Sequence, residues 1–281
     1  MKISVYRVIR FLLKILLNRL NKTKIITPYL LCRLENLSAR IIGSKTSFKY
    51  DKIEKSFIAK DSRNKRYFLN KERGFKLYRR GIEERGKFIF SSYCMHNIKF
   101  EDGDVIVDCG ANLGDLSIEL EKIPQRINYI GLEPAPQDFL SLKKNINLDN
   151  AIVLNKALGE ENSILKLYVS SEKGDSSLIK PKKYSEIIDV EVLRLDSLCD
   201  DLGIDKIKFL KVEAEGYEPE ILNGAKRVLR NVDYIAVDGG YERGSDLEQT
   251  FTRITNFLLD NNFELVDIFF PWHRALFKRK S

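Results

Sequence analysis

From residue 103 onward, short hydrophobic runs alternate along the chain with longer amphipathic segments. The runs are rich in Val, Ile and Leu, a composition typical of buried β-strands. They lie at Val105–Asp108, Tyr129–Leu132, Ile152–Asn155, Ile207–Val212 and Tyr234–Val237. Hydrophobic spacing of three or four residues predicts helices at about Gly114–Lys122 and Pro136–Asn147. The same spacing predicts a helix that follows Glu213–Gly216 and ends at Leu222, and another at Leu247–Leu259. This alternation predicts an α/β fold, in which a mostly parallel sheet carries helices on both faces.

Four further segments have strand character. Residues 164–169 and 187–193 are rich in β-formers and lie on either side of a polar stretch. Phe263–Phe270 and Arg274–Phe277 close the pattern, and their short separation predicts a hairpin.

The chain before residue 103 has a different texture. Its hydrophobic spacing predicts helices in residues 1–45 and over Phe75–His96, with a short strand at Arg66–Leu69. We therefore expect a basic N-terminal extension, helical in part, over residues 1–74, and one catalytic domain over residues 75–281.

Charge separates the two parts further. Residues 1–100 hold 25 Lys and Arg but only 7 Asp and Glu, whereas acidic residues exceed basic ones in the remainder. Such asymmetry indicates different partners for the two halves. The basic half suits an anionic membrane, an acidic glycan or a nucleic acid. No nucleic acid is expected, because the basic segments lack interleaved aromatic residues.

Residues 1–24 contain seven basic residues and no acidic one, with hydrophobic residues at helical spacing. The hydrophobic run is shorter than the about 18 residues that a spanning helix needs. One interpretation is an interfacial helix on an anionic membrane, which predicts a cytoplasmic protein peripheral on the inner face of the membrane. The alternative is a helix that packs on its own domain or on a partner. Binding to anionic vesicles would distinguish the two interpretations. Deletion of residues 1–24 should abolish this binding if the helix lies on the membrane, and should leave it unchanged otherwise.

Cysteine and histidine offer little metal chemistry. The four cysteines are widely spaced without a C-x-x-C pair, and only two histidines are present. We therefore expect reduced thiols and no metal cofactor.

The segment Asp108–Gly114 is a glycine loop between a predicted strand and a predicted helix. Gly110 and Gly114 allow a ligand close to the main chain, and the helix start favours an anionic group. A dinucleotide loop has the pattern G-x-G-x-x-G, but Asn112 stands at the second glycine. Asp108 would repel a pyrophosphate, whereas it would attract the ammonium and sulfonium groups of S-adenosylmethionine.

Two more strand ends carry candidate residues. Glu133 follows the second strand and precedes Pro134, a position from which a carboxylate accepts hydrogen bonds from ribose hydroxyls. Asn155–Leu158 follows the third strand, where an adenine would lie. Because parallel strands end at one edge of the sheet, these residues are expected to meet there.

The segment Lys211–Glu218 contains three carboxylates within six residues at a strand end. Repulsion between them would raise the pKa of one toward that of a general base. For Glu218 an alternative stays open, since an acidic residue also stabilises the start of the next helix.

Together these blocks resemble the FkbM-type methyltransferase family. The resemblance covers about residues 75–240 and rests on the blocks Gly103–Gly114, Glu133-Pro134, Ala157–Gly159, Leu195–Leu198 and Leu210–Glu218, with Leu222 and Gly224-Ala225. It implies a Rossmann-like class I methyltransferase fold, S-adenosylmethionine as donor, and O-methylation of a sugar, polysaccharide or secondary metabolite. The family usually has Asp where this chain has Glu213.

The expected donor-binding residues are Asp108, Gly110, Ala111, Asn112, Gly114, Glu133, Pro134, Ala157, Leu158 and Glu213. Glu215 is the main candidate for the general base or the acceptor-orienting group, with Asp115 and His96 as weaker candidates. Two rival functions stay open at this point: a nicotinamide-dependent oxidoreductase, and a non-catalytic membrane or glycan adaptor on the same fold.

Overall fold

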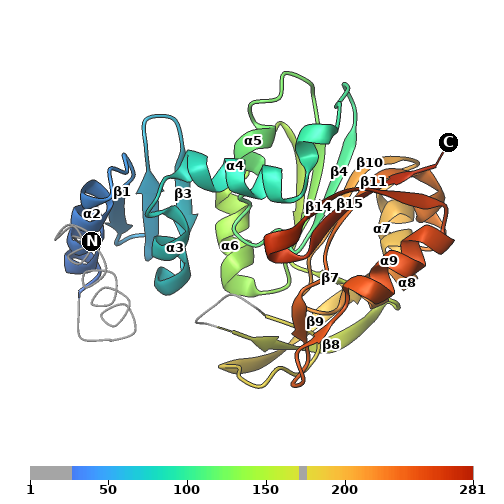
Figure 1. The fold of residues 1–281 in the computed structure, drawn as a ribbon. Coiled ribbons are helices and arrows are strands. Elements are labelled where there is room, and N and C mark those ends of the chain that lie inside the picture. Colours follow the sequence, from blue (N-terminus) through green and yellow to red (C-terminus); the bar gives the residue numbers. More distant parts are fainter. Residues whose placement is uncertain (1–26, 171–175, 281) are drawn as a thin grey trace, which may run out of the picture. The chain divides into compact units, whose positions relative to one another are not determined.

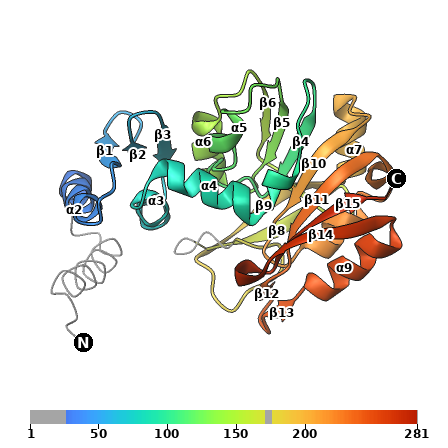
Figure 2. The same cartoon turned by 45° about the horizontal axis from the view of Figure 1, so that its top comes forward.

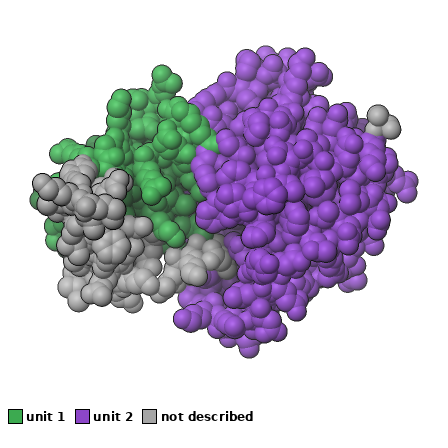
Figure 3. Space-filling model, in the orientation of Figure 1, with its two compact units in different colours: residues 1–87 green, residues 88–281 purple. Residues whose placement is uncertain are grey.

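The computed structural model describes residues 27–170 and 176–280. Residues 1–24, for which a membrane-contacting helix was expected, lie outside this described part. The chain forms two compact units, residues 1–87 and residues 88–281 (Figure 3). None of the described helices is long and hydrophobic enough to cross a membrane.

The described part of the first unit combines helices with a small antiparallel sheet in the order β1-β2-β3. Its elements are α2 (Pro28–Ile41), β1 (Ser47–Asp51), β2 (Ser56–Lys60), β3 (Lys65–Phe68) and α3 (Lys71–Tyr78), and α4 (Ile82–Ser92) leads into the second unit. Four buried rings, those of Phe48, Phe57, Phe68 and Phe75, pack with centroids 5.0 to 6.4 Å apart. β3 confirms the expected strand, whereas β1 and β2 were not expected, because few aliphatic residues mark them.

The second unit is built on a seven-stranded sheet in the order β14-β15-β11-β10-β4-β5-β6 (Figures 1 and 2). Its strands are β4 (Val105–Cys109), β5 (Asn128–Leu132), β6 (Asn150–Leu154), β10 (Ile207–Val212), β11 (Val232–Asp238), β14 (Phe263–Phe269) and β15 (Arg274–Arg279). β15 pairs antiparallel with both of its neighbours, and the other strands run parallel. The predicted mostly parallel α/β sheet and the predicted C-terminal hairpin are confirmed.

Alternate residues of the central strands feed two hydrophobic cores, as the period of a β-strand requires. Leu210 packs in one core with α7 (Leu195–Leu202), α8 (Glu218–Asn223) and α9 (Phe251–Asp260). Phe209 packs in the other core with Ile89 of α4 and Leu120 of α5 (Ser117–Leu120). Helix α6 (Pro136–Asn145) follows β5 and contacts β6.

Two smaller sheets lie beside the large one. β7 (Ala157–Leu158), β8 (Ser163–Val169) and β9 (Glu186–Leu193) form the first, in the order β7-β9-β8. β12 (Tyr241–Arg243) and β13 (Glu248–Gln249) form a short hairpin after β11. Single 3-10 turns are η1 (Met95–Asn97), η2 (Val228–Asn231) and η3 (Phe270–Trp272).

Three helix predictions were wrong in extent. The helix expected over Gly114–Lys122 is regular only in α5, because the glycine loop continues past Gly114, where φ is 80°. The helix expected from Leu247 begins at Phe251, because residues 248–249 pair with β12 instead. The helix expected over Phe75–His96 is divided near Gly81, where φ is 139°.

Candidate functional site

The predicted site residues meet at the edge of the sheet where the parallel strands end. In the pairing of β4 with its neighbours, Asp108 lies opposite Gly131 of β5 and Lys211 of β10, and Val212 lies opposite Val237 of β11. The segments that follow all four strands therefore start side by side. Ligands in open α/β sheets bind at this edge.

The glycine loop is tightly folded against the turn after β10. Gly110 has a φ of 75°, and a Cβ atom added to it would overlap the carbonyl oxygen of Glu213. Asn112 also adopts a left-handed conformation, with φ at 51°. Its buried Oδ1 atom has no hydrogen-bond partner among the described residues. A buried acceptor without a protein partner is a candidate for a contact with a ligand or an ordered water.

Glu133 connects the glycine loop to the end of β5. One of its carboxylate oxygens accepts a hydrogen bond from the amide of Asn112, and the other accepts one from the amide of Ala135, each at 2.9 Å. Asn155 donates to the carbonyl oxygens of Glu133 and Pro134, at 2.9 and 3.0 Å. The ends of β5 and β6 and the glycine loop therefore form one connected structure.

Asp108 is buried beneath the loop, and both of its carboxylate oxygens have protein partners. Lys211 donates to Oδ1 at 2.9 Å, and the hydroxyl of Tyr129 donates to Oδ2 at 2.7 Å. Lys211 also donates to the carbonyl oxygen of Gly110 at 2.9 Å. A direct contact between Asp108 and the donor stays a prediction, and the described geometry gives Asp108 a role in fixing Lys211 and the loop.

Glu213 lies between two cations. Lys211 contacts its Oε2 and Arg274 contacts its Oε1, both at 2.9 Å. Burial alone would raise the pKa of Glu213, but the attraction of Lys211 and Arg274 is larger and holds this pKa well below its usual range.

Arg274 is the centre of the network on its other side. It donates to Asp238 at 2.7 Å and to the hydroxyl of Ser92 at 2.7 Å. Tyr93 presents its ring to both cations, with the Arg274 guanidinium 4.3 Å and the Lys211 ammonium 5.2 Å from the ring centroid. Buried charges that are paired and hydrogen bonded in this way are held in fixed positions.

Glu218 and Glu215 have different surroundings, although both follow the same strand. Glu218, the first residue of α8, is fully buried and accepts hydrogen bonds from the amides of Ala214 and Gly216 and from Thr250, at 2.9 to 3.1 Å. Burial raises its pKa to about 7. Glu215 has a φ of 51°, which is unusual for a residue with a side chain. Its carbonyl oxygen accepts a hydrogen bond from Ser177 at 2.9 Å.

The remaining candidates are placed more loosely. Ala157 and Leu158 form β7, buried against Val192 and Leu193 of β9. Asp115 is buried between Gly114 and α5. His96 lies in η1, is more than half exposed, and approaches Asp267 of β14 at 3.8 Å. No described contact joins His96 to Glu213, Glu215 or Glu218. The catalytic roles of Asp115 and His96 stay predictions.

Sequence reasoning missed four residues of this edge: Tyr93, Asp238, Glu242 and Arg274. Two of them could have been found from the sequence. Asp238 directly follows one predicted strand and Arg274 begins another, and polar residues at such positions can contact the site. The contact between Asp238 and Arg274 could not have been predicted, because it joins residues 36 positions apart on two antiparallel strands.

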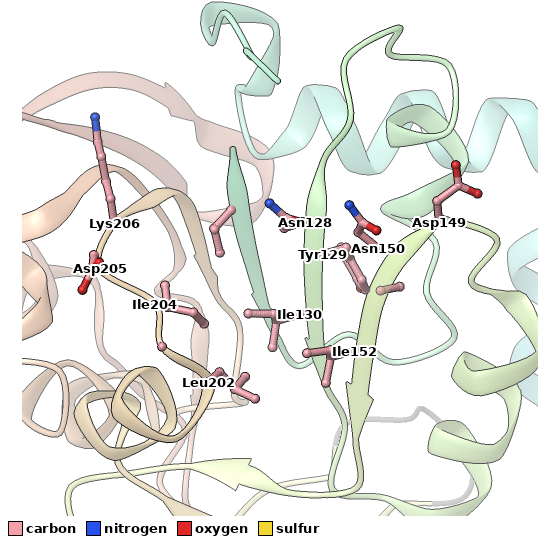
Figure 4. A pocket seen from close by; sticks show the side chains of 13 residues that line it. Asn128, Tyr129, Ile130, Asp149, Asn150, Ile152, Leu202, Ile204, Asp205 and Lys206 are labelled. Atoms are coloured by element: carbon pink, nitrogen blue, oxygen red, sulfur yellow. The ribbon is translucent and has the colours of Figure 1, made fainter. Parts of the chain in front are cut away.

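A surface pocket of about 630 Å³ lies elsewhere, at the amino ends of β4, β5 and β6 and beside the loop before β10 (Figure 4). Ile130 and Ile152 point into it from the sheet, and Asp205 and Lys206 come from the loop. None of the predicted site residues lines it, so it is separate from the candidate site.

Comparisons with known proteins agree with this geometry. The family described as "Methyltransferase FkbM domain" matches residues 108–265. The chain is 28% identical over 184 residues to the methyltransferase sdnD of Sordaria araneosa, with 52% of this chain and 71% of sdnD covered. It is 24% identical over 148 residues to the 2-O-methyltransferase NoeI of Sinorhizobium fredii (strain NBRC 101917 / NGR234), with 47% of this chain and 61% of NoeI covered.

Among solved structures, fibrillarin of Aeropyrum pernix with natively bound S-adenosyl-L-methionine is 15% identical. The match has a TM-score of 0.42 and covers 82% of this chain and 96% of fibrillarin. The family match, by contrast, extends over more than half of this chain and includes the glycine loop, Glu133 and the Glu213–Glu218 turn. The protein therefore belongs to the FkbM methyltransferase family, with a class I methyltransferase fold and S-adenosylmethionine as its methyl donor.

Proposed function

We propose that the protein transfers the methyl group of S-adenosylmethionine to a hydroxyl of a sugar, a polysaccharide or a secondary metabolite. The observation that carries this proposal is the group of carboxyl side chains where β10 and β11 end, beside the glycine loop. The sulfonium donor is already a strong electrophile, so the protein must orient the acceptor oxygen and remove its proton. The similarity to the 2-O-methyltransferase NoeI supports oxygen as the acceptor atom.

The donor side of the edge fits S-adenosylmethionine. Where this side borders the acceptor side, Asp108, Glu213 and Asp238 carry one negative charge more than Lys211 and Arg274 balance, which favours a cationic sulfonium there. Glu133 stands directly after β5, a position from which a carboxylate accepts hydrogen bonds from ribose hydroxyls. In this proposal the Gly110–Gly114 main chain approaches the donor closely, and Pro134, Ala157 and Leu158 lie on the side of the adenine.

Glu215 is the residue that we place against the acceptor hydroxyl, to orient it or to accept its proton. Its left-handed conformation is held by Ser177 on its own carbonyl oxygen and by Glu218 on the amide of Gly216. A strained residue that its surroundings hold this firmly is typical of a functional position. We expect Glu215→Gln to lower turnover by about 100-fold or more, while the affinity for S-adenosylhomocysteine stays within about twofold.

The test has two steps. Calorimetric titration of the purified full chain with S-adenosylhomocysteine and with NAD measures the cofactor preference. Transfer of a radiolabelled methyl group from S-adenosylmethionine to a panel of methyl glycosides and phenols then measures the activity. Binding of NAD without binding of S-adenosylhomocysteine would exclude the proposed function. Methyl transfer to amines but to no hydroxyl would exclude oxygen as the acceptor atom.

A further inference from the structure

Three of the carboxyl groups around the ends of β10 and β11 are poorly suited to accept a proton from a substrate. Glu213 is held ionised by Lys211 and Arg274, so it is a weak base. Asp238 is buried and accepts hydrogen bonds from Arg274 and from the amide of Gly240. Glu218 is fully enclosed by main-chain amides and Thr250. An acceptor cannot reach the last two.

Glu242 is the carboxyl group at this edge that has both access and an altered environment. It stands on β12, immediately after the turn that follows Asp238, and it is half-buried. A Cβ atom added to Gly240 would lie 3.3 Å from the carboxyl carbon of Glu242 and 3.5 Å from the Asp238 Oδ1 atom. Both carboxyl groups therefore border this glycine. The carboxyl group of Glu242 is also hydrogen bonded to the side chain of Glu215. Carboxyl groups that lie close together repel one another when all are ionised, and this repulsion raises the pKa of one of them.

The contact between Glu242 and Glu215 is built into the fold. Arg243, the next residue of β12, donates to the carbonyl oxygen of Gly216 at 2.6 Å and forms an ion pair with Glu220 at 2.8 Å. A Cβ atom on Gly216 would lie 2.5 Å from the Cα atom of Arg243, so the two backbones touch. This clamp holds β12 against the turn that carries Glu215.

Burial, together with neighbouring negative charges, gives Glu242 the basicity that the reaction needs. Burial, with repulsion by Asp238, Glu213 and Glu218, raises the pKa of Glu242 to about 8, although the hydrogen bond with Glu215 lowers it. A base is most effective when its pKa lies near the working pH.

The same cluster of carboxyl groups contains a polar atom without a partner. The fully buried hydroxyl of Tyr93 faces Glu213 and Asp238 without a hydrogen bond of normal geometry. An unpaired polar group at this depth indicates a place for a polar ligand atom or its water.

We propose that Glu242 accepts the proton of the acceptor hydroxyl, and that Glu215 orients this hydroxyl and Glu242. The acceptor oxygen forms a bond to the methyl carbon while the bond from that carbon to sulfur breaks and leaves its electron pair on sulfur. The hydroxyl proton passes to the carboxylate of Glu242 and later to solvent. This inference rests on the proposed O-methyl transfer, and it assigns to Glu242 the proton that Glu215 alone would otherwise take.

The decisive experiment titrates the glutamate carboxyl groups of the full chain by NMR, with ¹³C label in the carboxyl carbons and S-adenosylhomocysteine present. One carboxyl signal should titrate near pH 8 in the wild type and be absent in Glu242→Gln. The matched control is Glu248→Gln, on the other strand of the same hairpin and exposed, which should leave that signal unchanged. If the signal of Glu242 titrates in the ordinary glutamate range, the proposal is wrong.

Methyl transfer to the best hydroxyl acceptor of the panel gives the second readout. Glu242→Gln should lower kcat by about 100-fold and abolish the rise of kcat between pH 6 and pH 8, with the KM for the donor unchanged. Glu242→Asp should keep the pH dependence at a reduced rate, and Glu248→Gln should match the wild type. Wild-type kcat in Glu242→Gln overturns the proposal, as does loss of donor affinity in that variant. If the wild type methylates no hydroxyl, the proposed function fails, whereas the carboxyl titration still decides on the basicity of Glu242.

Discussion

The proposed donor side, around the glycine loop and Glu133, and the proposed acceptor side, around the ends of β10 and β11, are held together by different means. On the donor side, most of the contacts that hold the loop involve main-chain groups. Glu133 accepts hydrogen bonds from two amides, and Gly110 contacts the Glu213 carbonyl group. On the acceptor side, the contacts involve side-chain charges, with Arg274 joining Glu213 and Asp238. A close contact between main-chain atoms, such as that of Gly110, does not depend on pH, whereas a charge network depends on every partner being ionised. The acceptor side should therefore be the more sensitive of the two to substitution and to pH.

The largest effect is expected from Arg274→Met, which removes the cation and leaves Glu213 and Asp238 without it. Loss of one partner from a buried ion pair costs roughly 3–5 kcal/mol of unfolding free energy. Urea unfolding at pH 7 measures this. Lys166→Met is the control, because Lys166 pairs with Asp189 at 3.0 Å on the surface, with both side chains 64% exposed. That exposed pair should contribute about 0–1 kcal/mol.

The same network fixes a pH dependence. Because the cations hold the folded-state pKa of Glu213 below its unfolded value, this stabilisation is present at neutral pH. It is lost as the pH falls below the unfolded glutamate pKa of about 4.3. An acid-induced loss of stability that is the same in the wild type and in Arg274→Met would contradict the network.

A smaller effect is expected on the donor side from Gly110→Ala. The added methyl group overlaps the Glu213 carbonyl oxygen, so the loop must shift, and we expect affinity for S-adenosylhomocysteine to fall by about 10- to 100-fold. Gly203→Ala is the matched control. Gly203 has a φ of 65°, close to the 75° of Gly110, but open space around it, so it tests the backbone strain alone. Equal affinities in the two variants would show that the close approach does not shape the donor site.

The smallest effect concerns Glu218, which lies between the two sides. Burial raises its pKa to about 7, so its contribution to stability is present below the unfolded pKa and is lost as the pH rises through about 7. Glu218→Gln can still accept from the amides of Ala214 and Gly216, and it stays neutral. We expect the loss of unfolding free energy between pH 5 and pH 8 to be about 1–2 kcal/mol smaller in this variant. The exposed Glu248→Gln should show the wild-type loss, and a wild-type loss in Glu218→Gln would refute the assignment.

The donor-side candidates can be brought to one edge of the sheet from the sequence because their signals are local. Strand, glycine loop and terminal carboxylate follow one another within a few residues at Asp108–Gly114 and at Glu133, and the parallel alternation places them at one edge. The acceptor side depends on tertiary contacts. Nothing near Glu242 in the sequence indicates that Arg243 will dock on Gly216 and bring it to Glu215. Likewise, the sequence around Arg274 does not reveal which carboxylates this residue will contact.

The order of the strands has a consequence for synthesis of the protein. β15 enters the sheet beside β11 although β12, β13, α9 and β14 are made first. While the nascent chain emerges from the ribosome, Arg274 follows Glu213 and Asp238, so until then Glu213 is paired with Lys211 alone and Asp238 lacks the guanidinium. Such a contact between distant residues also slows folding. The charge network is thus assembled last, and a chain stalled before residue 274 would contain the donor loop without its finished neighbour.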